Sequence, residues 1–105
     1  MQTFLQLTFL VSGSKKLTLN WVNKKVTASW NSVFTSLHPL YYEVSAGSVQ
    51  AGVNIIQWQE TNQTSIMFGI PSSVLVKSGL PVHVTVRAVS VGGFTAVKIG
   101  NFTLP

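Results

Sequence analysis

The feature that most constrains the fold of this chain is a regular alternation of apolar and more polar side chains. The alternation is clearest over residues 82–89, where Val82, Val84, Val86 and Ala88 are separated by single other residues. Successive side chains of a β-strand point to opposite faces of a sheet, so this period of two predicts a strand with one buried face.

The same period recurs along most of the chain, with short polar or Gly/Pro-containing connections between the segments. Val, Thr and Ile supply 30 of the 105 residues, and branched side chains fit a pleated surface better than a helix. Short strands at regular spacing predict an antiparallel β-sandwich or barrel. The expected strands are residues 17–21, 26–30, 40–46, 55–59, 66–70, 82–89 and 95–104.

Four landmarks in this pattern carry a family resemblance. They are residues 26–30 (VTASW), 42–44 (YEV), 82–89 (VHVTVRAV) and the glycine turn at 92–93. In this order and at this spacing, residues 15–105 resemble a fibronectin type III domain. The family usually has Tyr where this chain has Val82, so here packing or the neighbouring Pro81 must hold that corner.

The resemblance implies the fold class and the core. The expected fold is an all-β, antiparallel, immunoglobulin-like sandwich of about seven strands. A chain of this length predicts one compact domain spanning residues 1–105. Residues 1–12 are expected to form either a first strand or the boundary of the domain. The expected core residues are Trp30, Tyr42, Val44, Val84, Val86 and Ala88.

Composition excludes several classes of chemistry. The chain has no Cys and no Asp, which removes cysteine nucleophiles and thiolate metal sites. Its two acids, Glu43 and Glu60, are expected on separate strands with no shared cleft, and His38 and His83 have no ligand-like spacing. We therefore expect no enzyme, no metal and no cofactor. No apolar stretch is long enough for a membrane helix.

The positive charge has two interpretations. Seven Lys/Arg against two Glu give a net charge of +5, which reflects a shortage of acids, and we expect no nucleic-acid partner. The pairs Lys15-Lys16 and Lys24-Lys25 would converge at one end of the fold, where they could bind a sulfated glycan such as heparin or an anionic lipid surface. The alternative, which we favour, is that they are ordinary solvated turn lysines.

One face of the predicted sandwich is a candidate interface. If segments 40–46 and 82–89 are neighbours, as the resemblance implies, Glu43 and Arg87 face outward together and form a cross-strand ion pair. Tyr, Trp and Arg are enriched at interface hot spots. The alternative is an ordinary sheet face with one apolar side chain folded over it. The candidate interface residues are Tyr41, Glu43, Trp58, His83, Arg87 and Phe94.

Two further features bear on the surroundings of the domain. Phe94, with Val33, Phe34 and Leu37, forms either an apolar contact surface at one end or a set of loop residues tucked onto the core. Two Asn-x-Thr triplets, at Asn62 and Asn101, are candidate N-glycosylation sites, and Asn62 is favoured because it lies in a turn-like polar stretch.

Together these features predict a non-catalytic protein-interaction or spacer module of a larger extracellular or cell-surface protein, such as an adhesion protein or receptor. Its partners would be another protein or adjacent domains of the same chain, and it would meet a membrane only through the parent chain. The alternatives are heparin or anionic-surface binding through the lysines, and an intracellular structural spacer of the same fold.

Overall fold

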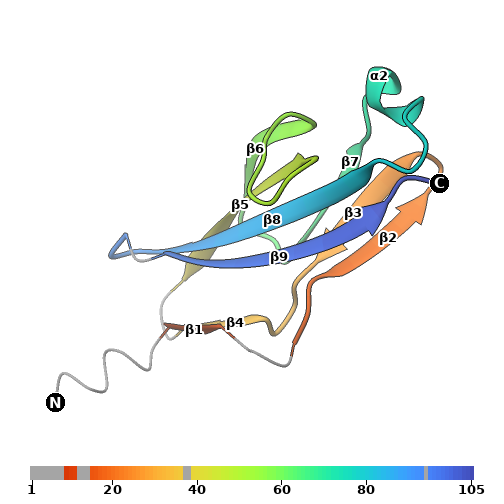
Figure 1. Ribbon diagram of the computed structural model, residues 1–105. Helices are drawn as coiled ribbons and strands as arrows, with labels where there is room; N and C mark the ends of the chain where they lie inside the picture. Colours follow the sequence, from red (N-terminus) through yellow and green to blue (C-terminus); the bar gives the residue numbers. More distant parts are fainter. Residues whose placement is uncertain (1–8, 12–14, 37–38, 94) are drawn as a thin grey trace, which may run out of the picture.

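Three antiparallel sheets make up the fold. The computed structural model describes residues 9–11, 15–36, 39–93 and 95–105, with backbone only at 9–11. In this described part the strands form sheets of three, four and two members (Figure 1). The first two sheets face each other across a shared core.

The three-stranded sheet has the order β2-β3-β7 and begins with a tight hairpin. Its strands are β2 (Thr18–Val22), β3 (Lys25–Ser29) and β7 (Ser65–Gly69). Val22 pairs with Lys25, which leaves a two-residue turn at Asn23 and Lys24. Both turn residues have positive φ, 53° and 63°. A two-residue turn of this kind matches the right-handed twist of the strands.

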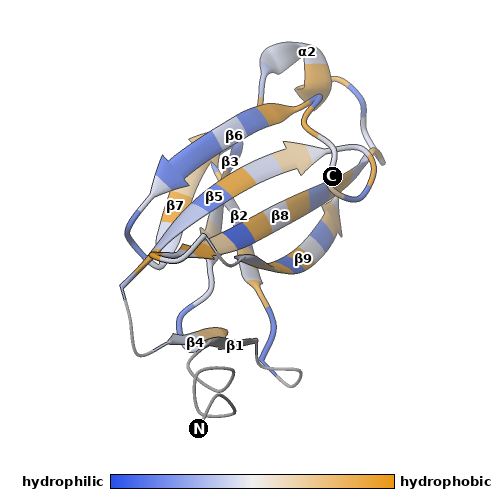
Figure 2. Ribbon diagram, turned by 90° about the vertical axis from the view of Figure 1, so that its left-hand side faces the viewer, coloured by the Kyte–Doolittle hydropathy of each residue, from blue (hydrophilic) through white to orange (hydrophobic). Residues whose placement is uncertain are grey.

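The four-stranded sheet has the order β6-β5-β8-β9, and Figure 2 shows these strands side by side. They are β5 (Leu40–Gly47), β6 (Ile56–Thr61), β8 (Pro81–Ser90) and β9 (Thr95–Thr103). The two central strands, β5 and β8, pair over eight successive positions from Leu40↔Ser90 to Gly47↔His83. This long register fixes which side chains lie next to each other on each face.

The core lies between the facing sides of these two sheets. Trp30, directly after β3, is 1% exposed, and its ring meets that of Tyr42 edge-on at 5.4 Å. The inward residues of β8 are fully buried because they are covered by the opposite sheet. All six expected core residues are buried, namely Trp30, Tyr42, Val44, Val84, Val86 and Ala88.

The predicted all-β antiparallel sandwich is confirmed, with seven strands in its two main sheets. β1 (Phe9–Val11) lies within residues 1–12, which were expected to form a first strand or the boundary of the domain. Two short elements were not expected. The first is β4 (Phe34–Ser36), which lies in a segment predicted to be a loop and pairs with β1. The second is the four-residue helix α2 (Ser72–Leu75), which lies in the connection after β7.

The apolar residues of the loop after Trp30 are placed only in part. Val33 and Phe34 are 1% and 8% exposed, so these two are tucked onto the core. Leu37, His38 and Phe94 lie outside the described residues. In the part of the chain that the structure describes, no helix is long and apolar enough to cross a membrane.

Candidate functional site

The candidate site is the solvent side of the four-stranded sheet, here called the outer face. Because Val44 and Val86 point into the core, their strand neighbours point outward. Register places Glu43 beside Arg87 and Ser45 beside Thr85 on this face. The sheet therefore brings side chains from distant parts of the sequence into short cross-strand rows.

An ion pair lies at the centre of the outer face. Arg87 Nε donates to Glu43 Oε1 at 2.8 Å, and the two side chains are 35% and 26% exposed. The pair expected between these residues is therefore present. Partial burial reduces its screening by salt, although exposed pairs contribute little to stability.

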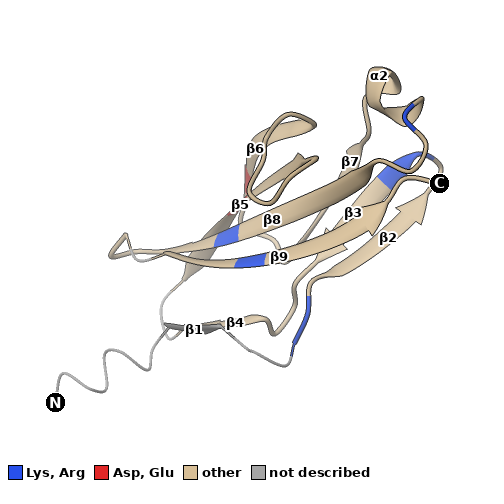
Figure 3. Ribbon diagram, in the orientation of Figure 1, with Lys and Arg blue, Asp and Glu red and all other residues tan. Residues whose placement is uncertain are grey.

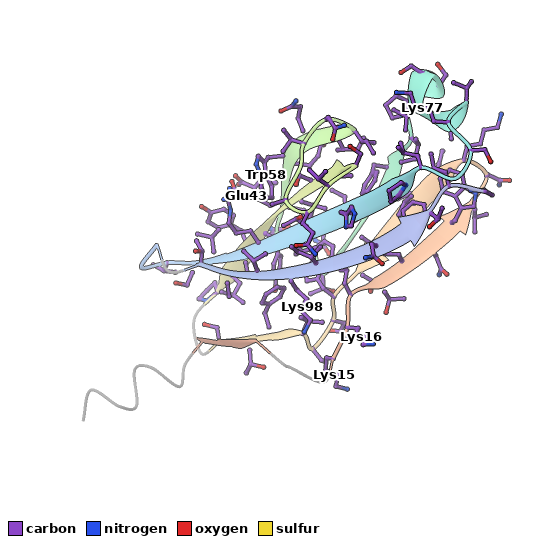
Figure 4. All side chains as sticks on the ribbon, in the orientation of Figure 1. Lys15, Lys16, Glu43, Trp58, Lys77 and Lys98 are labelled. Atoms are coloured by element: carbon purple, nitrogen blue, oxygen red, sulfur yellow. The ribbon has the colours of Figure 1, made fainter. Side chains whose placement is uncertain are left out.

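Trp58 extends the ion pair across a third strand. Its ring centroid lies 4.3 Å from Arg87 Cζ, in cation–π geometry. Trp58 belongs to β6 and Arg87 to β8, and β5 lies between them. Strands two positions apart are about 9–10 Å apart, so the indole must extend across β5 to reach Arg87. Figure 4 shows Trp58 and Glu43 together on this side.

A small residue on β5 makes room for the indole. Val44 pairs with Gln59 and Ala46 with Ile56, so a bulge places two β6 residues, one of them Trp58, opposite Ser45. Ser45 is 0% exposed although it points away from the core. We conclude that Trp58 lies over Ser45. Glu43, Arg87 and Trp58 are called the Trp58 stack below.

Two hydroxyl groups beneath the stack have no hydrogen-bond partner among the described residues. They are Ser45 Oγ and Thr85 Oγ1, and Thr85 is 1% exposed. Both side chains point outward and are nevertheless buried, so neighbouring side chains of the outer face cover them.

The second acid also lies on this face, which corrects an expectation. Glu43 and Glu60 were expected on separate strands with nothing to bring them together; they do lie on separate strands, β5 and β6, but as direct cross-strand partners. The sequence pattern does not reveal this pairing because the β6 bulge sets the register. Like charges in opposite positions repel, and Arg87 offsets only one of them. Glu60 is exposed, with no ion pair in the described part.

Charge is segregated between this face and the rest of the surface. The outer face carries Glu43, Glu60 and Arg87, a net charge of −1. The six lysines lie elsewhere, and the Asp/Glu colour in Figure 3 is confined to β5 and β6. Even Lys98 lies on the inward side of β9, opposite Val86.

Apolar side chains surround the Trp58 stack. Val97 pairs with Arg87 and Ile99 with Thr85, and they are 48% and 36% exposed. Tyr41 is 39% exposed on the same side. The outer face therefore gathers five of the six candidate interface residues, and only Phe94 is outside the described part. Val97 and Ile99 were missed, although the alternation over 95–104 could have placed them.

The prediction that the four lysines converge at one end is wrong. Lys15 and Lys16 precede β2, whereas Lys24 and Lys25 lie at its far end, so the extended strand separates the pairs. Figure 3 shows the basic residues at both ends of β2. A cavity of about 240 Å³ lies beside the hairpin end, lined by Trp21, Lys24, Leu75, Leu104 and Pro105.

The remaining titratable and modifiable residues complete the description. Burial raises the pKa of Tyr42 above its ordinary value of 10, because desolvation disfavours the phenolate. Among the described residues no three His, Cys, Asp or Glu side chains gather as a metal site would need. Asn62, in the turn between β6 and β7, and Asn101, on β9, are both exposed.

Comparison with known proteins identified no relative of this chain. No protein-family model matches it, and no curated protein or solved structure matches it significantly.

Proposed function

We propose that this chain is a non-catalytic protein-interaction module of the fibronectin type III kind, within a larger extracellular or cell-surface protein. The outer face is its contact surface. The single observation that carries this proposal is the Trp58 stack. In it, side chains from three strands form an ion pair and a cation–π contact above two buried hydroxyl groups.

The fibronectin type III assignment is supported by where the family landmarks lie. Trp30 follows β3 and packs against Tyr42 of β5, across the sandwich. Val84, Val86 and Ala88 form the buried face of β8 beside β5. Residues from three of the family landmarks thus meet in one core.

The composition of the outer face supports protein binding. Tyr, Trp and Arg dominate interface hot spots because they bury large area while losing few rotamers. Tyr41, Trp58 and Arg87 lie together here, with Val97 and Ile99 beside them. The Trp58 stack is held before any partner arrives, which lowers the entropy cost of binding.

The charges indicate the kind of partner. Glu60 is an exposed acid on a face of net charge −1, next to a second carboxylate that already has a cation. A partner that presents a Lys or Arg beside an apolar patch would pair with Glu60 and cover Trp58. An anionic glycan would meet two carboxylates there, so the outer face itself is not a site for heparin.

The test uses tetramers of the chain on a panel of cultured animal cells. We expect binding that is lost when surface proteins are digested with protease. Truncating a hot spot weakens binding by about tenfold or more, so Trp58→Ala should show at least that loss, and Glu60→Lys should also reduce binding. Met67→Ala is the matched control, since Met67 is 62% exposed on the other sheet.

Two results would contradict the proposal. Binding that survives Trp58→Ala would place the contact elsewhere on the molecule. Binding that disappears after heparinase treatment and not after protease would favour the glycan alternative.

A further inference from the structure

One of the two Asn-x-Thr triplets lies on the outer face itself. Asn101 is the cross-strand partner of His83 on β8, two positions along β9 from Ile99. Asn101 and Thr103 are both exposed, because alternate residues of a strand share a face. Phe102, between them, points inward and meets Trp21 at 5.8 Å. The acceptor amide and the hydroxyl of the triplet are thus presented together.

We propose that Asn101 carries an N-linked glycan that lies over the outer face. In the transfer, Asn101 Nδ2 forms a bond to C1 of the first sugar of a polyprenyl-diphosphate-linked oligosaccharide. The bond from C1 to the phosphate oxygen breaks, the lipid diphosphate leaves, and the amide proton passes to solvent. No oxidant or reductant is needed.

The distances on the sheet place the Trp58 stack within reach of such a glycan. Arg87 is four residues along β8 from His83, which is about 13 Å at the rise of an extended strand. An oligosaccharide of several rings spans that length, and glycans are bulky and solubilising. The glycan would cover exposed Ile99 and Val97, which otherwise leave apolar surface in water.

The second triplet provides a control within the same chain. Asn62 lies in the turn that crosses from β6 of one sheet to β7 of the other. Its Oδ1 accepts from Gln63 Nε2 at 3.4 Å, and all three residues of the triplet are exposed. A glycan on Asn62 would stand at the connection between the sheets and leave the outer face open.

The glycan rests on the extracellular location in the proposed function, and a regulatory consequence rests in addition on the proposed contact surface. If the outer face binds a partner, a glycan on Asn101 blocks that binding. Only the chain without a glycan on Asn101 can then bind the partner. Occupancy of one acceptor would then decide how much of the protein is competent to bind.

The first experiment measures occupancy. The chain is secreted from cultured human cells behind an added cleavable signal, and its intact mass is measured before and after N-glycanase. We expect a glycanase-sensitive mass increment assigned to Asn101, absent in Asn101→Gln and in Thr103→Ala. Thr103→Ser should keep it, because Asn-x-Ser is also an acceptor, and Asn62→Gln should leave it unchanged. An increment unaffected by Asn101→Gln would overturn the proposal.

The second experiment locates the glycan. Hydroxyl-radical footprinting, read by mass spectrometry, compares the glycosylated chain with Asn101→Gln. We expect several-fold lower oxidation of Trp58 and Ile99 when the glycan is present, and equal oxidation of Met67 on the other sheet. Equal oxidation of Trp58 in both proteins would show that the glycan points away, and would overturn the covering role.

Neither experiment needs a binding partner, so the two proposals can fail separately. If the glycan protects Trp58 and Trp58→Ala binds cells as well as the unaltered chain, the outer face is not the binding surface and the glycan only covers apolar surface. If Trp58→Ala loses cell binding and Asn101 carries no glycan, only the proposed glycan is refuted.

Discussion

The outer surfaces of the two sheets have the same pleat and very different side chains. On the four-stranded sheet, Arg87 and Trp58 extend over neighbouring strands and contact each other. On the three-stranded sheet, two of the three outward rows are Thr18–Ser29–Ser65 and Asn20–Thr27–Met67, and the third is Val22–Lys25–Gly69. The side chains of the first two rows, apart from Met67, are short and polar, and Lys25 is the only charged residue on the strands of that sheet.

This difference shows that exposure alone does not make a recognition surface. Met67 and Val22 are 62% and 63% exposed on the three-stranded sheet, more than any apolar residue of the outer face. Met67 lies in a row of short polar side chains and Val22 lies beside Lys25. Single exposed apolar residues are normal on protein surfaces. The outer face differs because long side chains span strands and fix one another, which requires a small residue such as Ser45 beneath them.

The largest expected effect comes from the core that supports both surfaces. Trp30→Ala removes a 1% exposed ring, and deleting a buried Trp costs about 3–5 kcal/mol, which is enough to unfold a marginal domain. Urea denaturation followed by circular dichroism measures the change. Met67→Ala, on the three-stranded face, should stay within about 0.5 kcal/mol. A near-neutral Trp30→Ala would mean that the two sheets do not close on this residue.

The sequence predicts the strands well because alternation is local and sheet burial enforces it. The Glu43–Arg87 pair was expected only because the family resemblance implies that segments 40–46 and 82–89 are neighbours, and the continuous register of β5 and β8 places the two residues opposite each other. The sequence does not predict the position of Glu60, because the bulge in β6 shifts the pairing by one residue. No local sequence pattern predicts that bulge. A one-residue slip moves a side chain to the other face.

The lysines and the short strand β4 were missed for other reasons. The separation of Lys16 from Lys24 depends on the intervening strand β2 being extended along its whole length. β4 has three residues and pairs with another three-residue strand. Elements this short carry too few alternating positions to be distinguished from a loop.

The next largest expected effect on stability comes from Ser45, which lies beneath Trp58. Ser45→Leu places a large side chain where the indole lies, so the ring must lift and the Arg87 contact is lost. Overpacking of this kind costs about 1–3 kcal/mol. Thr27→Leu is the matched change on the three-stranded face, at the centre of a row without a crossing ring, and should stay within about 0.5 kcal/mol.

Urea denaturation of the two variants, with tryptophan emission as a second readout, tests the contrast. We expect red-shifted native emission in Ser45→Leu only, because Trp58 becomes more exposed to water. Equal stabilities for the two variants would remove the distinction drawn between the faces.

The smallest expected effect isolates the ion pair from its repulsive neighbour. Glu43→Gln alone removes the attraction to Arg87 and also relieves repulsion from Glu60, so its stability change understates the pair. A double-mutant cycle with Glu43→Gln and Arg87→Gln cancels the second term. We expect a coupling of about 0.2–1 kcal/mol, smaller in concentrated salt because screening weakens an incompletely buried pair.

The neutral pair Asn20 and Thr27 on the other face provides the control, since its coupling should not respond to salt. If the Glu43–Arg87 coupling were as insensitive to salt as that control, Trp58 stacking and not charge would hold Arg87 in place. Arg87→Lys keeps the charge and loses the planar stack. In that case Arg87→Lys would lower the free energy of unfolding as much as Arg87→Gln does.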